Sequence, residues 1–505
     1  MTRLHNNRLR RSALGAAATL TASVLTASVL GALPAAAAPQ PTAPQLKLIT
    51  ASGSVTVDRW KDAPGVYLDL GAYVTVDKAP LEFRVTRQSY KDPVVAQQIL
   101  RQGGTTRTRT LPAGLLKDFK GLPDFLQVTV TNAAGAKVLG TTQSFCPNNT
   151  AGRIRPDAPA TSNYPARCAD NPFTLGSVWG TEKGWAASLS PDYDAAPVDL
   201  PAGEYTAKIS VAKKYRDLFG MANQPQTVKL TVRETDDGGR GGAVKHGTAT
   251  GSALKPNAHR PAGRRGNAAV MPKPDLRAVP AWGIALTDGG DEPGEGAAAD
   301  KEYLAFSATV WNGGPAPLVV DGFRSPGQEK MDAYQYFFDA NGKQVGYTPT
   351  GTMEWDPREG HQHWHFSDFA SYRLLGADKK EIVRSGKEAF CLADTDAIDY
   401  TVKNANWHPE NTDLSTACGE QNSVSVREAL DVGNGDTYSQ YRPGQSFDVT
   451  GLPNGTYYIQ VVANPDHKLK ETSLTNNVSL RKVILGGTPG ARTVTVPAYG
   501  LVDSH

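Results

Sequence analysis

Short runs of alternating apolar and polar residues, punctuated by glycine and proline, constrain the fold of this chain more than any other feature. One design occurs twice, because LPAGEYTAKISVA at 200–212 and LPNGTYYIQVVA at 452–463 each place a Pro/Gly turn before an alternating strand. Both segments have the pattern of β-sandwich edge strands or hairpins. Other strand-like runs are LKLITASGSVTV, LEFRVTR, FLQVTVTN and VKLTVRE in the first half, and YLAFSATVWN and SFDVTGL in the second. Long helical periodicity is scarce, so the sequence predicts an all-β fold with two β-sandwich-type halves.

A basic, glycine-rich segment separates the two halves. Between residues 238 and 273 the chain has eight glycines, no acid and seven basic residues, among them Arg264 and Arg265. This composition cannot bury a core, so it predicts a flexible linker. Two functional interpretations stay open beside a simple tether. The linker could hold an anionic surface, or it could present Arg264 and Arg265 to a protease as the boundary of a pro-segment.

The N-terminus is typical of a secretory signal peptide. Residues 1–38 have a positively charged start, an apolar stretch and small residues near Ala38. Arg10 and Arg11 leave both the general and the twin-arginine export routes open. Removal of this segment deletes four arginines and changes the formal charge from +3 to −1, which argues against a nucleic-acid partner. No later segment approaches the roughly 20 apolar residues that span a bilayer, so we expect a secreted protein without a membrane span.

Three histidines lie within five residues, at His361, His363 and His365 in EWDPREGHQHWHFSDF. Residues two apart in a strand share a face, so the three imidazoles can converge on one metal ion. Imidazole suits zinc, copper, iron and nickel, and three nitrogen ligands leave an open position, as in catalytic sites. The flanking aromatic residues distinguish this segment from a polar histidine-rich tract that binds metal adventitiously, which is the alternative.

The histidine segment and two later segments together resemble the lysyl oxidase family, and the resemblance is to a secreted, bacterial member of that family. SGKEAFCLADT at 385–395 resembles the lysine-containing segment of that family, and GDTYSQY at 435–441 resembles its tyrosine-containing segment. The resemblance implies that the three histidines bind Cu(II) and that Lys387 and Tyr438 become the family's lysine tyrosylquinone. It also implies oxidation of peptidyl-lysine ε-amines or small primary amines by O₂ to aldehydes, with release of ammonia and hydrogen peroxide.

The chemistry explains why these residue types are needed together. A phenol near Cu(II) and oxygen can be oxidised to a quinone, and an ε-amine within reach adds to the ring. Metal, tyrosine and lysine must therefore meet in one pocket, so the fold must bridge the sequence separation of 51 residues from Lys387 to Tyr438. By themselves these two residues would be read as a solvated lysine and a tyrosine in a turn or rim.

Two further segments resemble the start and end of the family's catalytic domain, PDL at 274–276 and NPDHKLKETSLTNN at 464–477. The resemblance implies a calcium site with oxygen ligands from Asp275, Leu276 (through its carbonyl), Glu471, Asn476 and Asn477. Ser473 stands where the family often has an acid, which lowers the charge of the site. The alternative is that LTNN is only a turn before the strand VSLRKVIL.

Four cysteines in a secreted chain predict two disulfides, for which three connectivities exist. The resemblance implies a bond between Cys391 and Cys418, which leaves Cys146 and Cys168 to pair in the first half.

The expected organisation is therefore two β-sandwich-type halves joined by the linker, the second half being a lysyl oxidase-like catalytic domain. We expect a signal peptide at 1–38, an immunoglobulin-like domain at 39–237, the linker at 238–273, the catalytic domain at 274–488 and a tail at 489–505. The first half could be a stabilising domain, a pro-domain or a partner-binding module. The alternatives to an amine oxidase are a non-catalytic secreted protein that binds copper or zinc or mediates adhesion, and a metal oxygenase on a β-barrel, a class that typically recruits a carboxylate ligand.

Overall fold

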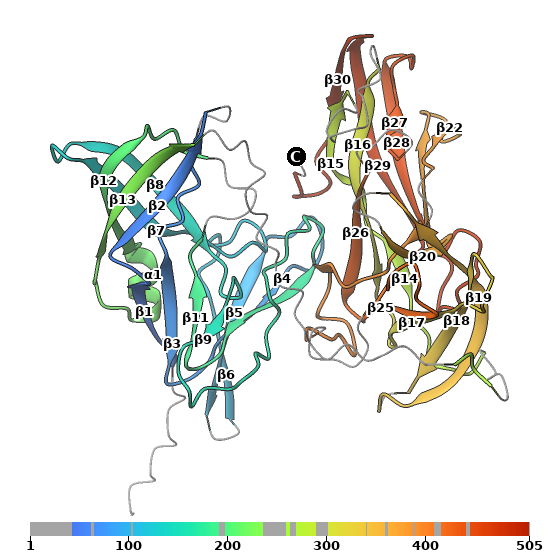
Figure 1. Cartoon of the computed structure of the whole chain (residues 1–505), viewed down its shortest axis with the longest axis horizontal. Coiled ribbons are helices and arrows are strands. Elements are labelled where there is room, and N and C mark those ends of the chain that lie inside the picture. The colour runs from blue at the N-terminus through green and yellow to red at the C-terminus, as the bar shows by residue number, and fades with distance from the viewer. Residues whose placement is uncertain are drawn as a thin grey trace, which may run out of the picture. The chain divides into compact units, whose positions relative to one another are not determined.

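The computed structural model describes residues 43–61, 65–102, 105–190, 197–235, 259–262, 269–288, 301–339, 341–358, 362–386, 389–408, 416–440 and 445–503. These residues form thirty strands and one short helix, α1 (Lys213–Phe219), which confirms the all-β prediction (Figure 1). No helix in this part of the chain is long and apolar enough to cross a membrane. The predicted signal peptide and most of the predicted linker lie outside the described residues.

Strands of the first half form three sheets. The first has the order β1 (Gln45–Thr50), β3 (Ala72–Asp77), β11 (Trp185–Ser188) and β9 (Gly152–Arg153). The second has the order β10 (Gly176–Thr181), β4 (Leu81–Thr86), β5 (Val95–Gln102) and β6 (Thr105–Thr110). The third has the order β2 (Ser54–Trp60), β13 (Gln226–Thr235), β12 (Gly203–Val211), β7 (Leu122–Asn132) and β8 (Lys137–Phe145).

Alternation along these strands builds a hydrophobic core in the first half. In β3, Ala72, Val74 and Val76 are buried and the residues between them are only partly covered. Because successive side chains of a strand point to opposite faces, this pattern buries one face of the sheet. Helix α1 joins the same core through the fully buried ring of Tyr215, whose hydroxyl donates to the carbonyl oxygen of Pro123 (2.7 Å).

Strands of the second half form three more sheets. One has the order β14 (Leu276–Ala278), β16 (Tyr303–Asn312), β26 (Asn434–Gln440) and β24 (Asp396–Ala397), and β15 (Trp282–Thr287) and β27 (Phe447–Asp448) also pair with β16. Another has the order β23 (Ala389–Phe390), β20 (His363–Ser367), β19 (Gln344–Asp356), β18 (Met331–Phe338), β17 (Leu318–Phe323) and β25 (Ser425–Leu430). The last has the order β22 (Glu381–Arg384), β21 (Ala370–Leu375), β28 (Gly455–Ala463), β29 (Val478–Thr488) and β30 (Ala491–Thr495).

The repeated Pro/Gly design folds in the same way in both halves. Tyr205 in β12 donates its hydroxyl to the carbonyl oxygen of Pro201 (3.0 Å), and Tyr457 in β28 donates to Pro453 (2.7 Å). Each tyrosine thus closes the turn before its own strand, like the tyrosine corner of β-sandwiches. The edge-strand alternative is wrong, since β12 lies between β13 and β7 and β28 lies between β21 and β29. Each strand therefore has main-chain partners on both sides.

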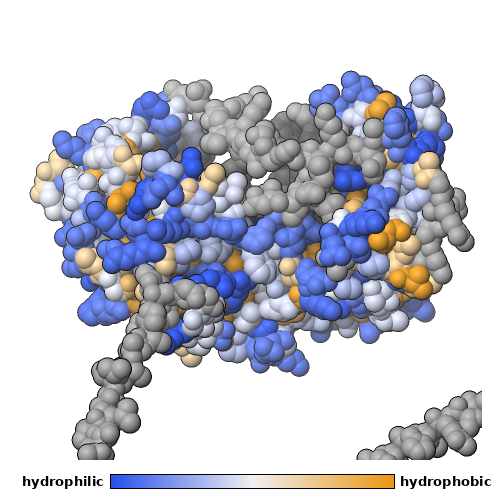
Figure 2. All heavy atoms as spheres, turned by 90° about the horizontal axis from the view of Figure 1, so that it is seen from below, coloured by the Kyte–Doolittle hydropathy of each residue, from blue (hydrophilic) through white to orange (hydrophobic). Residues whose placement is uncertain are grey.

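Exposed hydrophobic residues are scattered over the surface. In the face shown in Figure 2, hydrophilic residues predominate among the described residues, and hydrophobic ones occur as small separate spots. The exposed large hydrophobic residues are spread along the sequence from Tyr67 to Leu501. Isolated apolar side chains are ordinary on protein surfaces, so their exposure needs no partner to explain it.

Candidate functional site

The predicted metal-binding strand is β20, between β19 and β23. Trp364 and Phe366 of this strand are fully buried in the core of the second half, so His363 and His365 lie on its opposite face. The centroids of the two imidazole rings are 4.6 Å apart. His361, the third predicted ligand, lies outside the described residues. The shared face expected for His363 and His365 is therefore observed, and metal binding stays a prediction.

Strand β19 brings a carboxylate to the histidine face. Asp356 is the register partner of His363, and its Oδ2 lies 3.5 Å from Nδ1 of His365. Burial alone would raise the pKa of Asp356, but the hydrogen bonds and positive charge of Arg358 hold this pKa well below its ordinary value. Asp356 is therefore ionised at neutral pH and can orient His365 through Nδ1, as carboxylates commonly do around metal-binding imidazoles. Sequence reasoning missed Asp356, although it lies only a few residues before the histidines.

This donor set fits a metal that prefers nitrogen ligands. Two imidazoles on one face, one of them oriented by a carboxylate, suit copper or zinc. Within the described stretches, no group of three or more His, Cys, Asp or Glu side chains is arranged to hold a metal. His361 would have to supply the third nitrogen.

The predicted quinone tyrosine lies on β26. Tyr438 donates its hydroxyl to the main-chain carbonyl oxygen of Cys391 (2.6 Å), and its ring centroid is 4.6 Å from that of Phe390. Burial raises the pKa of the Tyr438 phenol well above its ordinary value, and the nearby Asp436 and Glu428 carboxyls raise it further. Lys387 lies outside the described residues, but Cys391 belongs to the same predicted segment. The structure thus brings Tyr438 against the segment that contains Lys387.

The phenol and the imidazoles approach β20 from different faces. Phe390 of β23 is the register partner of Phe366 of β20, and both rings point into the core. Tyr438 packs against this core, whereas His363 and His365 lie on the other face of the strand. Strand alternation therefore puts the phenol against the core face of β20 and the predicted copper ligands on the opposite face.

Two buried carboxyls lie beside Tyr438. Asp436 shares a face of β26 with Tyr438 because the two residues are two apart, and it is 2% exposed. Glu428 of β25 is fully buried, and its Oε2 accepts a hydrogen bond from the N–H of Leu392 (3.1 Å). Among the described residues, no hydrogen bond of good geometry reaches either carboxylate oxygen of Asp436 or Oε1 of Glu428, although the main-chain N–H of Ala393 acts on Asp436. Buried polar groups are rarely left in this state outside functional sites.

Burial raises the pKa of both carboxyls. For Asp436 the Glu428 carboxyl adds to the effect of burial and the main-chain N–H of Ala393 opposes it. For Glu428 the main-chain N–H groups of Leu392 and Phe366 oppose the effect of burial. A titratable group with a strongly shifted pKa beside a predicted cofactor residue is a candidate functional group. Sequence reasoning missed both acids, and the available signal was the placement of Asp436 two residues before Tyr438.

The two disulfides have the pairing that the resemblance implied, Cys391 with Cys418 and Cys146 with Cys168. The first one connects the predicted site residues. The carbonyl oxygen of Cys391 accepts the Tyr438 hydroxyl, and that of Cys418 accepts the N–H of Trp364 (3.1 Å), which stands between His363 and His365. This cystine therefore links the tyrosine strand to the histidine strand.

The predicted calcium ligands also converge. Asn476 Nδ2 donates to both carboxylate oxygens of Asp275 (3.1 and 3.0 Å), and Glu471 accepts from the N–H of Leu276 (2.9 Å) and from Asn477 Nδ2 (2.8 Å). Within the described residues, Oδ1 of Asn476 and Oδ1 of Asn477 are buried without hydrogen-bond partners. Orphaned amide oxygens beside two carboxylates are a suitable donor set for a hard cation, so these residues fit calcium. Arg277 competes for this site, because its Nε donates to Asp275 (2.7 Å).

We expect Asp436→Asn to weaken the pH dependence of stability. The folded-state pKa of Asp436 lies above its ordinary value of 3.8, so protonation of this carboxyl stabilises the folded protein. That stabilisation is lost as pH rises through the raised pKa, and the free energy of unfolding falls. Replacement by asparagine should remove up to about 1.4 kcal/mol per pH unit from that decline. The measurement is urea unfolding at several pH values above 4. Glu329→Gln, an exposed carboxyl, is the control, and an unchanged slope in Asp436→Asn would contradict the assignment.

We expect Ca²⁺ to raise the melting temperature of the protein, because a ligand that binds only the folded state stabilises it by about 2.7 kcal/mol at a hundred times its Kd. Glu471→Gln should remove this shift, since it deletes one of the two carboxylates. Thermal unfolding with and without Ca²⁺ measures the effect, with Mg²⁺ as the control ion. An equal shift in the variant and the unmodified protein would rule out Glu471 as a ligand.

Comparison with known proteins identifies relatives of the second half. Residues 337–493 match the lysyl oxidase family. The chain is 33% identical over 129 residues to Lysyl oxidase homolog 2A of Danio rerio, which covers 25% of this chain and 16% of that protein. It is 33% identical over 126 residues to Protein-lysine 6-oxidase of Homo sapiens, which covers 25% of this chain and 26% of that protein. It is 29% identical over 143 residues to Lysyl oxidase homolog 2 of Bos taurus, which covers 27% of this chain and 16% of that protein.

The chain thus spans about a sixth to a quarter of the length of these curated relatives. The family match includes the histidine, lysine and tyrosine segments, whereas Asp275 and Leu276 lie before it. Residues 337–493 of this chain therefore belong to the lysyl oxidase family.

Proposed function

We propose that this protein is a secreted, copper-dependent amine oxidase that converts primary amines to aldehydes with O₂ and releases ammonia and hydrogen peroxide. The preferred substrates are ε-amines of peptidyl lysine, with small primary amines as the simpler alternative. The observation that carries the proposal is the hydrogen bond from Tyr438 to Cys391, because it brings the predicted tyrosine to the segment of the predicted lysine. The family match over residues 337–493 supports the same reading.

His361, His363 and His365 would hold the copper ion, with Asp356 orienting His365. Lys387 and Tyr438 would provide the quinone, which in such enzymes serves as the carbonyl that accepts the substrate amine and as an electron sink. The ring of Tyr438 packs against Phe390 of the core, which shields part of it from water.

Asp436 is the candidate proton acceptor. Oxidation of an amine to an aldehyde requires loss of a proton from its α-carbon, and a general base near the cofactor supplies this step. Asp436 shares a face of β26 with Tyr438, and the main-chain N–H of Ala393 opposes only part of the rise of its pKa. Burial raises the pKa of Asp436, so its carboxylate form is a stronger base than that of an exposed aspartate.

A second candidate function is non-catalytic binding of copper or zinc. The observation that favours it is the position of Tyr438 on the face of β20 opposite to His363 and His365. An amine oxidase of this kind needs the phenol near the metal, whereas a metal-binding protein has no such requirement.

We expect copper to produce a covalent link between Lys387 and Tyr438 and to confer peroxide release on addition of a primary amine. Peptide mapping by mass spectrometry of protein prepared with and without copper measures the link. Lys387→Arg should bind copper but form no link, because a guanidinium is a poor nucleophile at neutral pH. His363→Ala should lose both the link and peroxide release. Full metal loading without a link would favour the second candidate function.

We expect Asp436→Asn to keep the covalent link but lower kcat by about 10²–10⁴-fold, the range lost with a general base. Glu428→Gln is the matched control, because it replaces the neighbouring buried acid and should keep kcat within about tenfold. An α-deuterated amine should slow Asp436→Asn more than the unmodified protein, since proton removal then limits the rate. A normal kcat in Asp436→Asn would exclude it as the base.

A further inference from the structure

A loop of the first half is buried against the second half. Residues 171–175 lead into β10, and Asn171, Phe173 and Thr174 are at most 1% exposed. Asn171 Nδ2 donates to Oγ1 of Thr309 on β16 (2.9 Å), and Thr174 Oγ1 donates to the carbonyl oxygen of Ala397 on β24 (2.7 Å). Loop side chains are rarely buried so completely, so this loop serves as a contact segment.

Main-chain hydrogen bonds extend the contact. The N–H of Leu175 donates to the carbonyl oxygen of Ile398 (2.7 Å), and the N–H of Tyr400 donates to Gly176 (3.0 Å). Gly176 and Asp399 form a parallel bridge. A Cβ atom on Gly176 would come within 2.7 Å of Thr401 Cγ2, so this close approach requires glycine.

Two apolar clusters flank these hydrogen bonds. Phe173 packs with residues from four parts of the second half, Val279, Trp311, Ile398 and Val502. On the other side, Tyr164 and Val178 pack with Tyr400 and Trp407, and the guanidinium of Arg84 lies 4.2 Å from the Trp407 ring. The contact therefore has a hydrophobic interior as well as polar bonds, as stable interfaces do.

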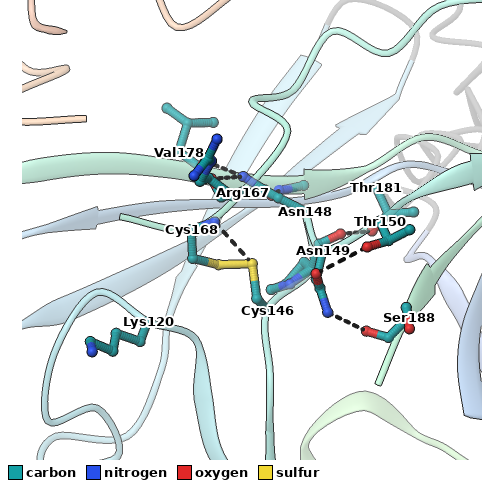
Figure 3. Close-up of a disulfide and its surroundings, with 12 residues drawn as sticks. Lys120, Cys146, Asn148, Asn149, Thr150, Arg167, Cys168, Val178, Thr181 and Ser188 are labelled. Atoms are coloured by element: carbon teal, nitrogen blue, oxygen red, sulfur yellow. Dashed lines mark hydrogen bonds between the residues drawn. A yellow bond between two sulfur atoms is a disulfide. The ribbon is translucent and has the colours of Figure 1, made fainter. Parts of the chain in front are cut away.

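The base of the loop is held rigidly within the first half. Cys168, three residues before Asn171, is bonded to Cys146, as Figure 3 shows. Beside this disulfide, buried Asn148 donates to the carbonyl oxygens of Arg167 and Val178 (both 3.1 Å). One side chain thus ties both ends of the loop together.

The contact leads to the strand that contains Tyr438. Thr309 accepts from Asn171 and shares a second hydrogen bond with Thr437 of β26 (2.7 Å). Tyr400, whose N–H donates to Gly176, donates its hydroxyl to Asn434 of β26 (2.8 Å). Two routes of hydrogen bonds therefore connect the loop to β26.

We propose that the first half is a permanent support for β26 and for residues 396–407, and that cutting the linker does not release it. Arg260 strengthens this conclusion, since its guanidinium contacts Ser325 (3.0 Å) and Gln328 (3.1 Å) of the second half. A cut at Arg264 and Arg265 would leave Arg260 on the first fragment. Any effect of this support on Tyr438 as a cofactor residue rests on the proposed function, whereas the association of the two halves does not.

The test uses metal-free, full-length protein with a specific protease site inserted between Arg264 and Arg265. After cleavage, both fragments should elute together in size-exclusion chromatography. Gly176→Val should separate them, because the new side chain meets Thr401 and Asp399. Gly152→Val is the matched control, since no atom lies within 4 Å of its added Cβ, and it should behave as the unmodified protein. Separation of the unmodified fragments would overturn the proposal.

Hydrogen exchange provides a second readout should Gly176→Val fail to fold. Asn171→Ala adds no atoms and removes the hydrogen bond to Thr309, together with the one that Oδ1 accepts from the N–H of Phe173. Amide exchange in β26 should therefore accelerate by about five- to tenfold. Unchanged exchange there would overturn the supporting role. With copper, both variants should form less of the link between Lys387 and Tyr438. A complete lack of link in the unmodified protein would count against the proposed function alone.

Discussion

The cystine formed by Cys391 and Cys418 is the constraint on which the candidate site depends. One of its carbonyl oxygens accepts the Tyr438 hydroxyl, and the other accepts the N–H of Trp364 between two histidines. A covalent bond between these segments limits their separation whatever the surrounding loops do. The cross-link also removes conformational freedom from the unfolded chain, which stabilises the folded state. The tyrosine strand and the histidine strand are therefore both hydrogen-bonded to one covalent cross-link, which includes Cys391 of the lysine segment.

Buried charged side chains near this cystine are of two kinds, those paired with an opposite charge and those without such a partner among the described residues. On one face of β25, Arg427 makes two hydrogen bonds to Asp321 of β17, so this buried pair satisfies itself. The next residue, Glu428, points to the opposite face, where it and Asp436 have oxygens that no hydrogen bond of good geometry reaches among the described residues. Leaving buried carboxyls unsatisfied costs stability. Among the described residues of the second half, the buried carboxyls with such oxygens lie next to Tyr438, which is the physical reason to place proton chemistry there.

The two halves share a local design but make different contributions. Both close the turn before a central strand with a tyrosine hydroxyl bonded to a proline carbonyl. The sites of predicted chemistry all lie in the second half. The first half instead contributes a buried loop, whose Asn171 is two hydrogen bonds away from Thr437. Stability of the strand that contains Tyr438 is therefore a property of both halves.

The alternation of residues determined much of this structure by itself. It predicted the all-β fold, the strand Tyr303–Asn312 at its observed bounds, and the shared face of His363 and His365. Resemblance to a family supplied the pairing of the cysteines and the order of the lysine and tyrosine segments. The sequence could not show Asp436 and Glu428 meeting in the core, or the loop at Asn171 reaching β16. A period of two fixes each residue's face relative to its own strand, but it contains no information on which distant strand covers that face. Tertiary packing alone decided that Tyr438 faces the buried Phe390 ring while the imidazoles lie on the far side of β20.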